Sequence, residues 1–123
     1  MQARKTMLVT GGGIGIGRAT ALAFARAGHH VVVTDILEDE GRAVVAQIAA
    51  AGGSAAFATL DVRDGAQVDA VVAAVQAQHG ALDALVLNAG IAHKVPLDQL
   101  DDARWHHTLD IDLTGMFRVA RAA

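Results

Sequence analysis

The sequence contains no cysteine, no tyrosine and a single proline, and aromatic residues make up 3% of its 123 residues. Without cysteine the chain can form no disulfide bond, thiol nucleophile or cysteine-ligated metal site, and we expect it to reside in a reducing cytoplasm. Without tyrosine, no mechanism that needs a phenol as acid or base is possible for these residues. No apolar run approaches the roughly 18 residues of a membrane span, and the polar first residues are unlike a signal peptide.

Charge is also sparse and carries no basic excess. The formal net charge is −3, so we expect no binding to nucleic acid and none to an anionic membrane surface. Hydrophobic residues make up 53% of the chain and charged residues 19%, which favours one globular domain over disorder. The six histidines lack the spacing of a metal site, such as two histidines four positions apart, and we expect no bound metal.

Short β-branched segments alternate along the chain with alanine-rich segments of helical periodicity. Strands are predicted over 6–10, 30–34, 54–60 and 84–87, and helices over 14–27, 37–51, between Asp64 and Gly80, and from about Asp101 to the end. Apolar strands separated by helices of this length require right-handed crossovers and a parallel sheet covered on both faces. The sequence therefore predicts an α/β fold: a single, doubly wound, Rossmann-type half-domain over residues 1–123, with strand order 3-2-1-4.

A glycine-rich segment joins the first predicted strand to the first predicted helix, and five of the seven residues from Gly11 to Gly17 are glycine. Such a loop lets the backbone approach a pyrophosphate, and it directs free N–H groups and the positive end of the helix dipole at the phosphates. The strict G-x-G-x-x-G spacing does not occur. Residues 13–17 would also fit the G-x-G-x-G loop of a methyltransferase, and a turn needed only for packing is a further alternative.

Asp35 ends the second predicted strand, and it follows the glycine loop at close to the spacing of about 20 residues typical of an acid that binds the adenosine ribose. A carboxylate at this position would repel a 2′-phosphate. Neither Ile14 nor Ile36 supplies a cation to neutralise such a phosphate, so NAD is predicted as the cofactor in preference to NADP. The alternative role for Asp35 is to cap the following helix, and the two roles are compatible.

Taken together, these segments resemble the short-chain dehydrogenase/reductase family over essentially the whole chain. Thr10, Gly11, Gly15 and Gly17 match the fixed positions of the family's T-G-x-x-x-G-x-G loop, and residues 88–90 match the N-A-G marker that follows the fourth strand. The resemblance implies hydride transfer between a nicotinamide and an alcohol or ketone carbon. It also implies that Asp61 and Val62 contact adenine, with the carboxylate accepting from the exocyclic amine, and that the N-A-G residues lie along the nicotinamide-side ribose. The cofactor-binding residues that we expect are Thr10, Gly11, Gly13, Gly15, Ile16, Gly17, Asp35, Ile36, Asp61, Val62, Asn88, Ala89 and Gly90.

Asp112 departs from the family pattern, because it stands where the family has the Asn of Asn-Leu-x-Gly. In the family that Asn helps to hold a water molecule in a proton relay. On a helical wheel Asp112 lies among residues 105, 109, 116 and 119, so we expect its carboxylate to face an apolar stripe. A carboxylate there must be paired, hydrated or protonated. An acid without a catalytic role is the alternative.

The family's catalytic Ser and its Tyr-x-x-x-Lys follow a fifth strand, and this sequence stops at Ala123, before either motif. We therefore expect the cofactor-binding half of an oxidoreductase, truncated and inactive alone. A non-catalytic nucleotide-binding or interaction module and a methyltransferase-like domain are the alternatives. Because the fourth strand would lack its neighbour, we also expect a homo-oligomer that forms through the last helix or the exposed edge of the sheet.

Overall fold

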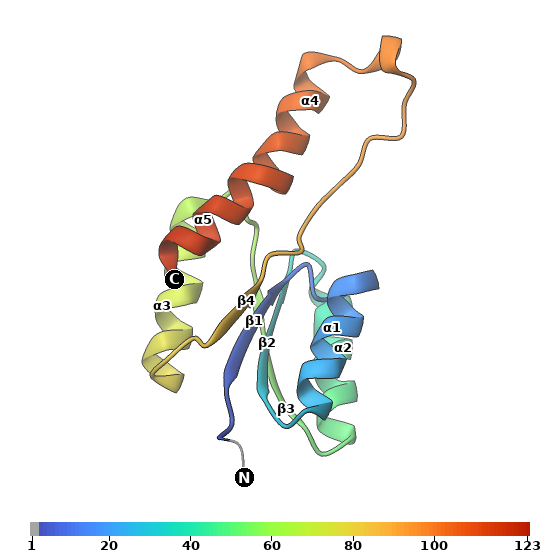
Figure 1. Cartoon of the computed structure of the whole chain (residues 1–123). Helices are drawn as coiled ribbons and strands as arrows, with labels where there is room; N and C mark the ends of the chain where they lie inside the picture. Colours follow the sequence, from blue (N-terminus) through green and yellow to red (C-terminus); the bar gives the residue numbers. More distant parts are fainter. Residues whose placement is uncertain (1–2) are drawn as a thin grey trace.

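The computed structural model describes residues 3–123, and one sheet of four parallel strands lies at its centre (Figure 1). In chain order the strands are β1 (Thr6–Thr10), β2 (His30–Asp35), β3 (Ser54–Thr59) and β4 (Ala84–Val86). They lie in the order β3-β2-β1-β4, and Leu8 of β1 pairs with Val32 on one side and with Leu85 on the other. The predicted fold class and strand order are confirmed.

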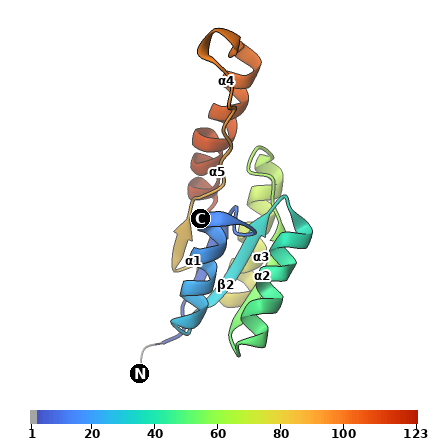
Figure 2. The same cartoon turned by 90° about the vertical axis from the view of Figure 1, so that its right-hand side faces the viewer.

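Helices cover both faces of the sheet. One face carries α1 (Gly15–Arg26) and α2 (Glu38–Ala50), and the other carries α3 (Gly65–His79) and the C-terminal helical segment (Figures 1 and 2). That segment follows a short 3₁₀ turn, η1 (Leu97–Gln99), and consists of α4 (Asp102–Leu109), a π-helical turn, η2 (Asp110–Thr114), and α5 (Gly115–Ala122). None of the helices within residues 3–123 is both long and apolar enough to cross a membrane.

The alternation of side chains along the strands divides the core between the two faces. Leu8 and Val32 point toward α3 and α5, where they meet a cluster that includes Val68, Val72 and Val119. The opposite side chains of β1 and β2 point toward α1 and α2; these are Val9, Val31 and Val33, and all three are fully buried. Central strands that are apolar on both faces are typical of parallel sheets covered by helices.

The C-terminal helix differs from its prediction as one regular helix. Asp101 caps it by accepting a hydrogen bond from the Arg104 N–H at 2.8 Å, and the π-helical turn then interrupts the regular spacing. Beyond that turn the helix comes close to the end of β3, because a Cβ atom on Gly115 would lie 2.6 Å from a methyl group of Val62. Arg118 strengthens this contact by donating to the Val62 carbonyl at 3.0 Å. The α4 part extends away from the sheet, and each of its residues is exposed or half-buried (Figure 1).

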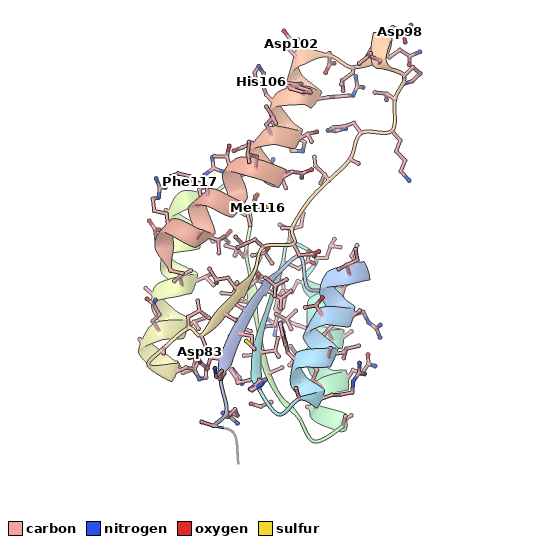
Figure 3. The ribbon with its side chains drawn as sticks, viewed as in Figure 1. Asp83, Asp98, Asp102, His106, Met116 and Phe117 are labelled. Carbon is pink, nitrogen blue, oxygen red and sulfur yellow. The ribbon has the colours of Figure 1, made fainter. Side chains whose placement is uncertain are left out.

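The opposite edge of the sheet, where the strands begin, is held by polar contacts. Asp83 precedes β4 and accepts from the Thr6 N–H at 2.8 Å, which ties β4 to β1 (Figure 3). His30, at the start of β2, lies 2.7 Å from the Ser54 hydroxyl through Nδ1, and its ring packs 4.3 Å from the ring of His79. Its Nε2 is buried without a hydrogen-bond partner in the described part of the chain. Burial, followed by the nearby charges of His79 and Arg4, lowers the pKa of His30.

We predict that His30 makes the fold sensitive to acid. Because the pKa of His30 is lowered in the folded chain, the unfolded chain binds more protons below the ordinary value of about 6.5. The free energy of unfolding should be at its full value above that pH and should fall as the pH drops below it. In the variant His30→Gln this loss should be smaller, although the lost ring packing lowers stability at every pH. Urea unfolding followed by circular dichroism at pH 7.5, 6.5 and 5.5 measures the effect.

His106→Gln is the matched control, because His106 is an exposed histidine on α4. This variant should retain the acid sensitivity of the unmodified chain. A His30→Gln variant that loses as much stability between pH 7.5 and 5.5 as the unmodified chain would contradict the prediction.

Candidate functional site

A cavity of about 560 Å³ lies where the parallel strands end, and each strand contributes to its wall. In open α/β sheets this edge is the usual place for ligands. The loop after β1 and the segments that follow β2, β3 and β4 line it, together with two side chains of the C-terminal helix. The lining residues are Gly11, Ile14, Gly15, Ile16, Asp35, Ile36, Leu37, Leu60, Asp61, Val62, Arg63, Asn88, Ala89, Gly90, Ile91, His107 and Ile111.

The glycines of the β1–α1 loop have two different structural roles. Gly17 allows the first turn of α1 to pack closely, since a Cβ atom there would collide with the carbonyl oxygen of Gly11 and would lie 2.6 Å from the Asn88 amide nitrogen. Gly15 has a φ of +57°, which favours glycine, and a Cβ atom on it would meet no described atom within 4 Å. Gly17 therefore maintains the packing of the loop, whereas Gly15 leaves its backbone open to the cavity.

The start of α1 offers backbone donors to this cavity. The helix begins at Gly15, and within residues 3–123 no side chain caps its N-cap residue, Ile14. The first N–H groups of a helix have no partner within the helix, and they carry the positive end of its dipole. An anionic group bound beside Gly15 and Ile16 would therefore be stabilised by these N–H groups.

Thr10 and Asn88 hold the cavity wall together. The Thr10 hydroxyl accepts from the backbone N–H groups of Asn88 and Ala89 at 2.9 and 3.0 Å, which joins the end of β1 to the segment after β4. The Asn88 side-chain amide donates to the carbonyls of Thr10 and Gly11 at 3.2 and 3.1 Å. Asn88 lines the cavity, whereas Thr10 lies behind the wall and positions it.

Asp35 is 7% exposed and lies in the cavity wall at the end of β2. One carboxylate oxygen accepts from the Gly13 N–H at 2.9 Å, and the other accepts from the Leu37 N–H at 3.0 Å. Gly13 must be glycine for this arrangement, because a Cβ atom there would lie 2.9 Å from the carboxylate. The N-cap of α2 is Leu37, so the alternative of Asp35 as the capping residue is wrong. Each carboxylate oxygen has capacity for a further hydrogen bond.

Asp61 and Arg63 form an ion pair in the wall beyond β3. The guanidinium Nη2 lies 2.7 Å from one carboxylate oxygen of Asp61, and Nε lies 3.0 Å from the other. The hydrogen bonds from Arg63 lower the pKa of Asp61, and the charge of His107 acts in the same direction. The sequence predicted Asp61 as a cofactor-binding residue but did not predict its partner.

Asp112 differs from its expected environment. Its carboxylate accepts from the Ile91 N–H at 2.8 Å, and so connects the C-terminal helix to the segment after β4. The expected apolar stripe does not form around it, because Trp105 and Met116 are 54% and 36% exposed. The π-helical turn that contains Asp112 breaks the regular spacing on which the helical wheel depended. Asp112 is absent from the cavity lining among the described residues.

Most of the predicted cofactor-binding residues meet at the cavity, although three do not. Thr10, Gly13 and Gly17 are absent from the described lining, and each instead supports it through a contact given above. The prediction missed seven lining residues: Ile14, Leu37, Leu60, Arg63, Ile91, His107 and Ile111. Five of these adjoin predicted site residues and could have been found by extending the motifs. The two on the C-terminal helix have no local signal, because tertiary packing brings them to the cavity.

Among known proteins, the chain resembles oxidoreductases. It is 42% identical over 114 residues to a 2,5-dichloro-2,5-cyclohexadiene-1,4-diol dehydrogenase of Sphingobium indicum, an alignment that covers 92% of this chain and 44% of that protein. It is also 42% identical over 119 residues to the peroxisomal hydratase-dehydrogenase-epimerase of Neurospora crassa, with coverage of 97% and 13%. The chain therefore spans less than half the length of both relatives.

Solved structures show the same likeness. A short-chain dehydrogenase/reductase from Burkholderia xenovorans superimposes with a TM-score of 0.90 at 37% identity, covering 96% of this chain and 49% of that one. A gluconate 5-dehydrogenase from Burkholderia cenocepacia, in complex with NADP and tartrate, superimposes with a TM-score of 0.86 at 37% identity, with coverage of 96% and 46%. The family model of the short chain dehydrogenases matches residues 5–123. The chain therefore belongs to the short-chain dehydrogenase family.

Proposed function

We propose that the cavity binds NAD(H), and that the chain supplies the cofactor-binding part of an oxidoreductase. That enzyme would transfer a hydride between the nicotinamide and an alcohol or ketone carbon. The observation that carries the proposal is that Gly15, with its open backbone, and Asp35, with its carboxylate, line one cavity. Family membership supports it, since the relatives named above are dehydrogenases.

The pyrophosphate would rest on the β1–α1 loop. Gly11 and Gly15 both have positive φ, so their backbone turns toward the cavity without a side chain to obstruct a ligand. The free N–H groups at the start of α1 would donate to the phosphate oxygens. The segment Asn88–Gly90 lies on the opposite wall and would run along the nicotinamide-side ribose.

The adenosine ribose would bind at Asp35, whose carboxylate oxygens can accept from its hydroxyl groups. A 2′-phosphate would meet the negative charge of Asp35 and the apolar side chains of Ile14 and Ile36, which are 56% and 63% exposed. Of the described lining residues, none beside Asp35 carries a positive charge, and Arg63 is already paired with Asp61. We therefore propose that NAD binds in preference to NADP, although two solved relatives are complexes with NADP.

Catalysis in the family requires a tyrosine as proton donor or acceptor, and these 123 residues contain none. We propose that this chain alone binds the cofactor without turnover. The structure gives Asp112 a positioning role at Ile91, which an Asn could also fill, since an amide oxygen accepts the same hydrogen bond.

Titration calorimetry tests the proposal as a whole. Saturable binding of NAD, with weaker binding of NADP and none of S-adenosylmethionine, is the expected result. Binding of S-adenosylmethionine in place of NAD would favour the methyltransferase-like alternative. A chain that binds none of the three would exclude the proposed function.

Asp35 is predicted to determine the preference between the two cofactors. The variant Asp35→Asn retains a side-chain oxygen to accept from the Gly13 N–H but loses the charge. Because hydrogen bonds to a charged group are worth about 1.5–3 kcal/mol, NAD affinity should fall about tenfold or more. NADP affinity should fall less or rise, because the repulsion is gone. Calorimetry with both dinucleotides measures the ratio, and an unchanged ratio would remove the argument for NAD.

A methyl group at Gly15 is predicted to block the phosphates. Gly15→Ala introduces backbone strain of about 1–2 kcal/mol from the positive φ, and it also places a methyl group in the cavity. Gly52→Ala is the matched control, because Gly52 has a φ of +82°, an equally open Cβ position and no place in the described lining. Both variants should lose similar stability in urea. NAD affinity should fall about tenfold or more in Gly15→Ala and remain unchanged in Gly52→Ala; equal affinities would place the phosphates elsewhere.

We further propose that copies of the chain associate through the C-terminal helix or the free edge of β4. Exposed apolar side chains gather on that helix, where Trp105, Leu113 and Phe117 are 54%, 64% and 57% exposed (Figure 3 labels Phe117). Within residues 3–123, β4 pairs with β1 alone. Light scattering at high micromolar concentration should detect dimers or larger species, and Phe117→Glu should shift the distribution to smaller ones if the helix is responsible. A monodisperse monomer would contradict the proposal.

A further inference from the structure

The wall segment from Asp61 to Arg63 presents an acceptor and a donor side by side. The Asp61 carboxylate receives three N–H donors from Arg63: the backbone N–H at 3.0 Å, Nε at 3.0 Å and Nη2 at 2.7 Å. A carboxylate offers about four lone-pair positions in all. Both residues line the cavity, so any amine that approaches Asp61 from the cavity meets a carboxylate that Arg63 already occupies.

We propose that Arg63 determines which purine base the cavity accepts, by competing with the base for the Asp61 carboxylate. This inference rests on the proposed function, since it assigns the adenine end of the dinucleotide to Asp61 and Val62. Arg63 weakens recognition of an exocyclic amine, and it adds a donor for a base that carries a carbonyl oxygen instead. Arg63 is therefore a specificity-determining residue.

The carboxylate is the fixed member of the pair. The Asp61 N–H donates to the Gln67 side chain at 2.6 Å, and the Asp64 N–H donates to the Asp61 carbonyl at 3.0 Å, so the turn is tied to the start of α3. The Asp64 side chain in turn accepts from the Gln67 N–H at 3.1 Å and caps that helix. The reciprocal bond of a capping box, from Gln67 to the Asp64 N–H, is replaced by the bond to Asp61.

The guanidinium is the member that can move. The Arg63 side chain is 45% exposed and stands on a flexible stem, and an exposed ion pair of this kind contributes little stability. Displacing Arg63 should therefore cost the dinucleotide no more than about fivefold in affinity. An adenine amine would pay this cost, because it needs the carboxylate as its acceptor. A hypoxanthine carbonyl would not, because it accepts from the guanidinium and would be repelled by a free carboxylate.

The pair also keeps Asp61 in the state that accepts hydrogen bonds. The hydrogen bonds from Arg63 lower the pKa of Asp61. Without Arg63 that pKa would return toward the ordinary value for aspartate, about 3.9, and the carboxylate would remain ionised near neutral pH. A change in base preference at pH 7.5 on removal of Arg63 would therefore report the guanidinium itself, and not protonation of Asp61.

The test compares NAD with nicotinamide hypoxanthine dinucleotide in the variant Arg63→Met. The two ligands carry the same phosphates, so the ratio of their dissociation constants cancels any general effect of removing a positive charge. In Arg63→Met the affinity for NAD should rise and that for the hypoxanthine dinucleotide should fall, which moves the ratio about threefold to fivefold or more toward adenine. Arg63→Lys, which keeps the charge but loses the two-point contact, should give an intermediate ratio.

Arg104→Met is the matched control, because Arg104 forms an exposed pair with Asp101 at 3.1 Å and is absent from the described cavity lining. Its ratio should equal that of the unmodified chain. An unchanged ratio in Arg63→Met, or equal weakening of both ligands, would overturn the inference and make Arg63 a general anchor. If the unmodified chain binds neither dinucleotide, the proposed function fails instead. Circular dichroism of each variant verifies that the fold is retained.

Discussion

The close packing of the first turn of α1 against the end of β1 is the contact on which the whole cavity depends. It requires the absence of a side chain at Gly17, since any Cβ atom there would collide with the Gly11 carbonyl. The Asn88 amide donates to that same carbonyl, so the contact also draws in the segment after β4. One glycine thus sets the distance between a strand, a helix and the opposite wall, and a cavity at the carboxyl edge of the sheet follows from it.

Carboxylates organise the rest of the wall, and each does so by accepting backbone N–H groups. Asp35 holds the glycine loop through Gly13, Asp61 holds Arg63, and Asp112 holds the segment after β4 through Ile91. Because these acids join segments that are distant in the sequence, their charges stand at fixed positions around the cavity. The same groups that fix its shape therefore also give it a negative lining on the side away from the glycine loop.

Local sequence preferences predicted the sheet well, because β-branched runs and the glycines that follow each helix act within a few residues. The predicted strand over residues 6–10 has the observed bounds, and the glycine loop lies at the cavity as expected. The contact of Asp112 could not be predicted, since a helical wheel assumes regular spacing and a π-helical turn breaks it. His107 and Ile111 reach the cavity only through packing of the C-terminal helix. Arg63 could have been found, because it stands two positions from Asp61.

The π-helical turn has a consequence for how the C-terminal helix tolerates change in length. It offsets the two ends of that helix, so Asp112 meets Ile91 while Arg118 meets the Val62 carbonyl and the Asp110 carboxylate. Deleting one residue between these anchors would restore the regular winding and rotate everything beyond it by about 100°. Val119 would then leave the core, and the contact of Gly115 with Val62 would be lost. The irregular turn is thus a phase adjuster that lets one continuous rod satisfy two separate attachment points.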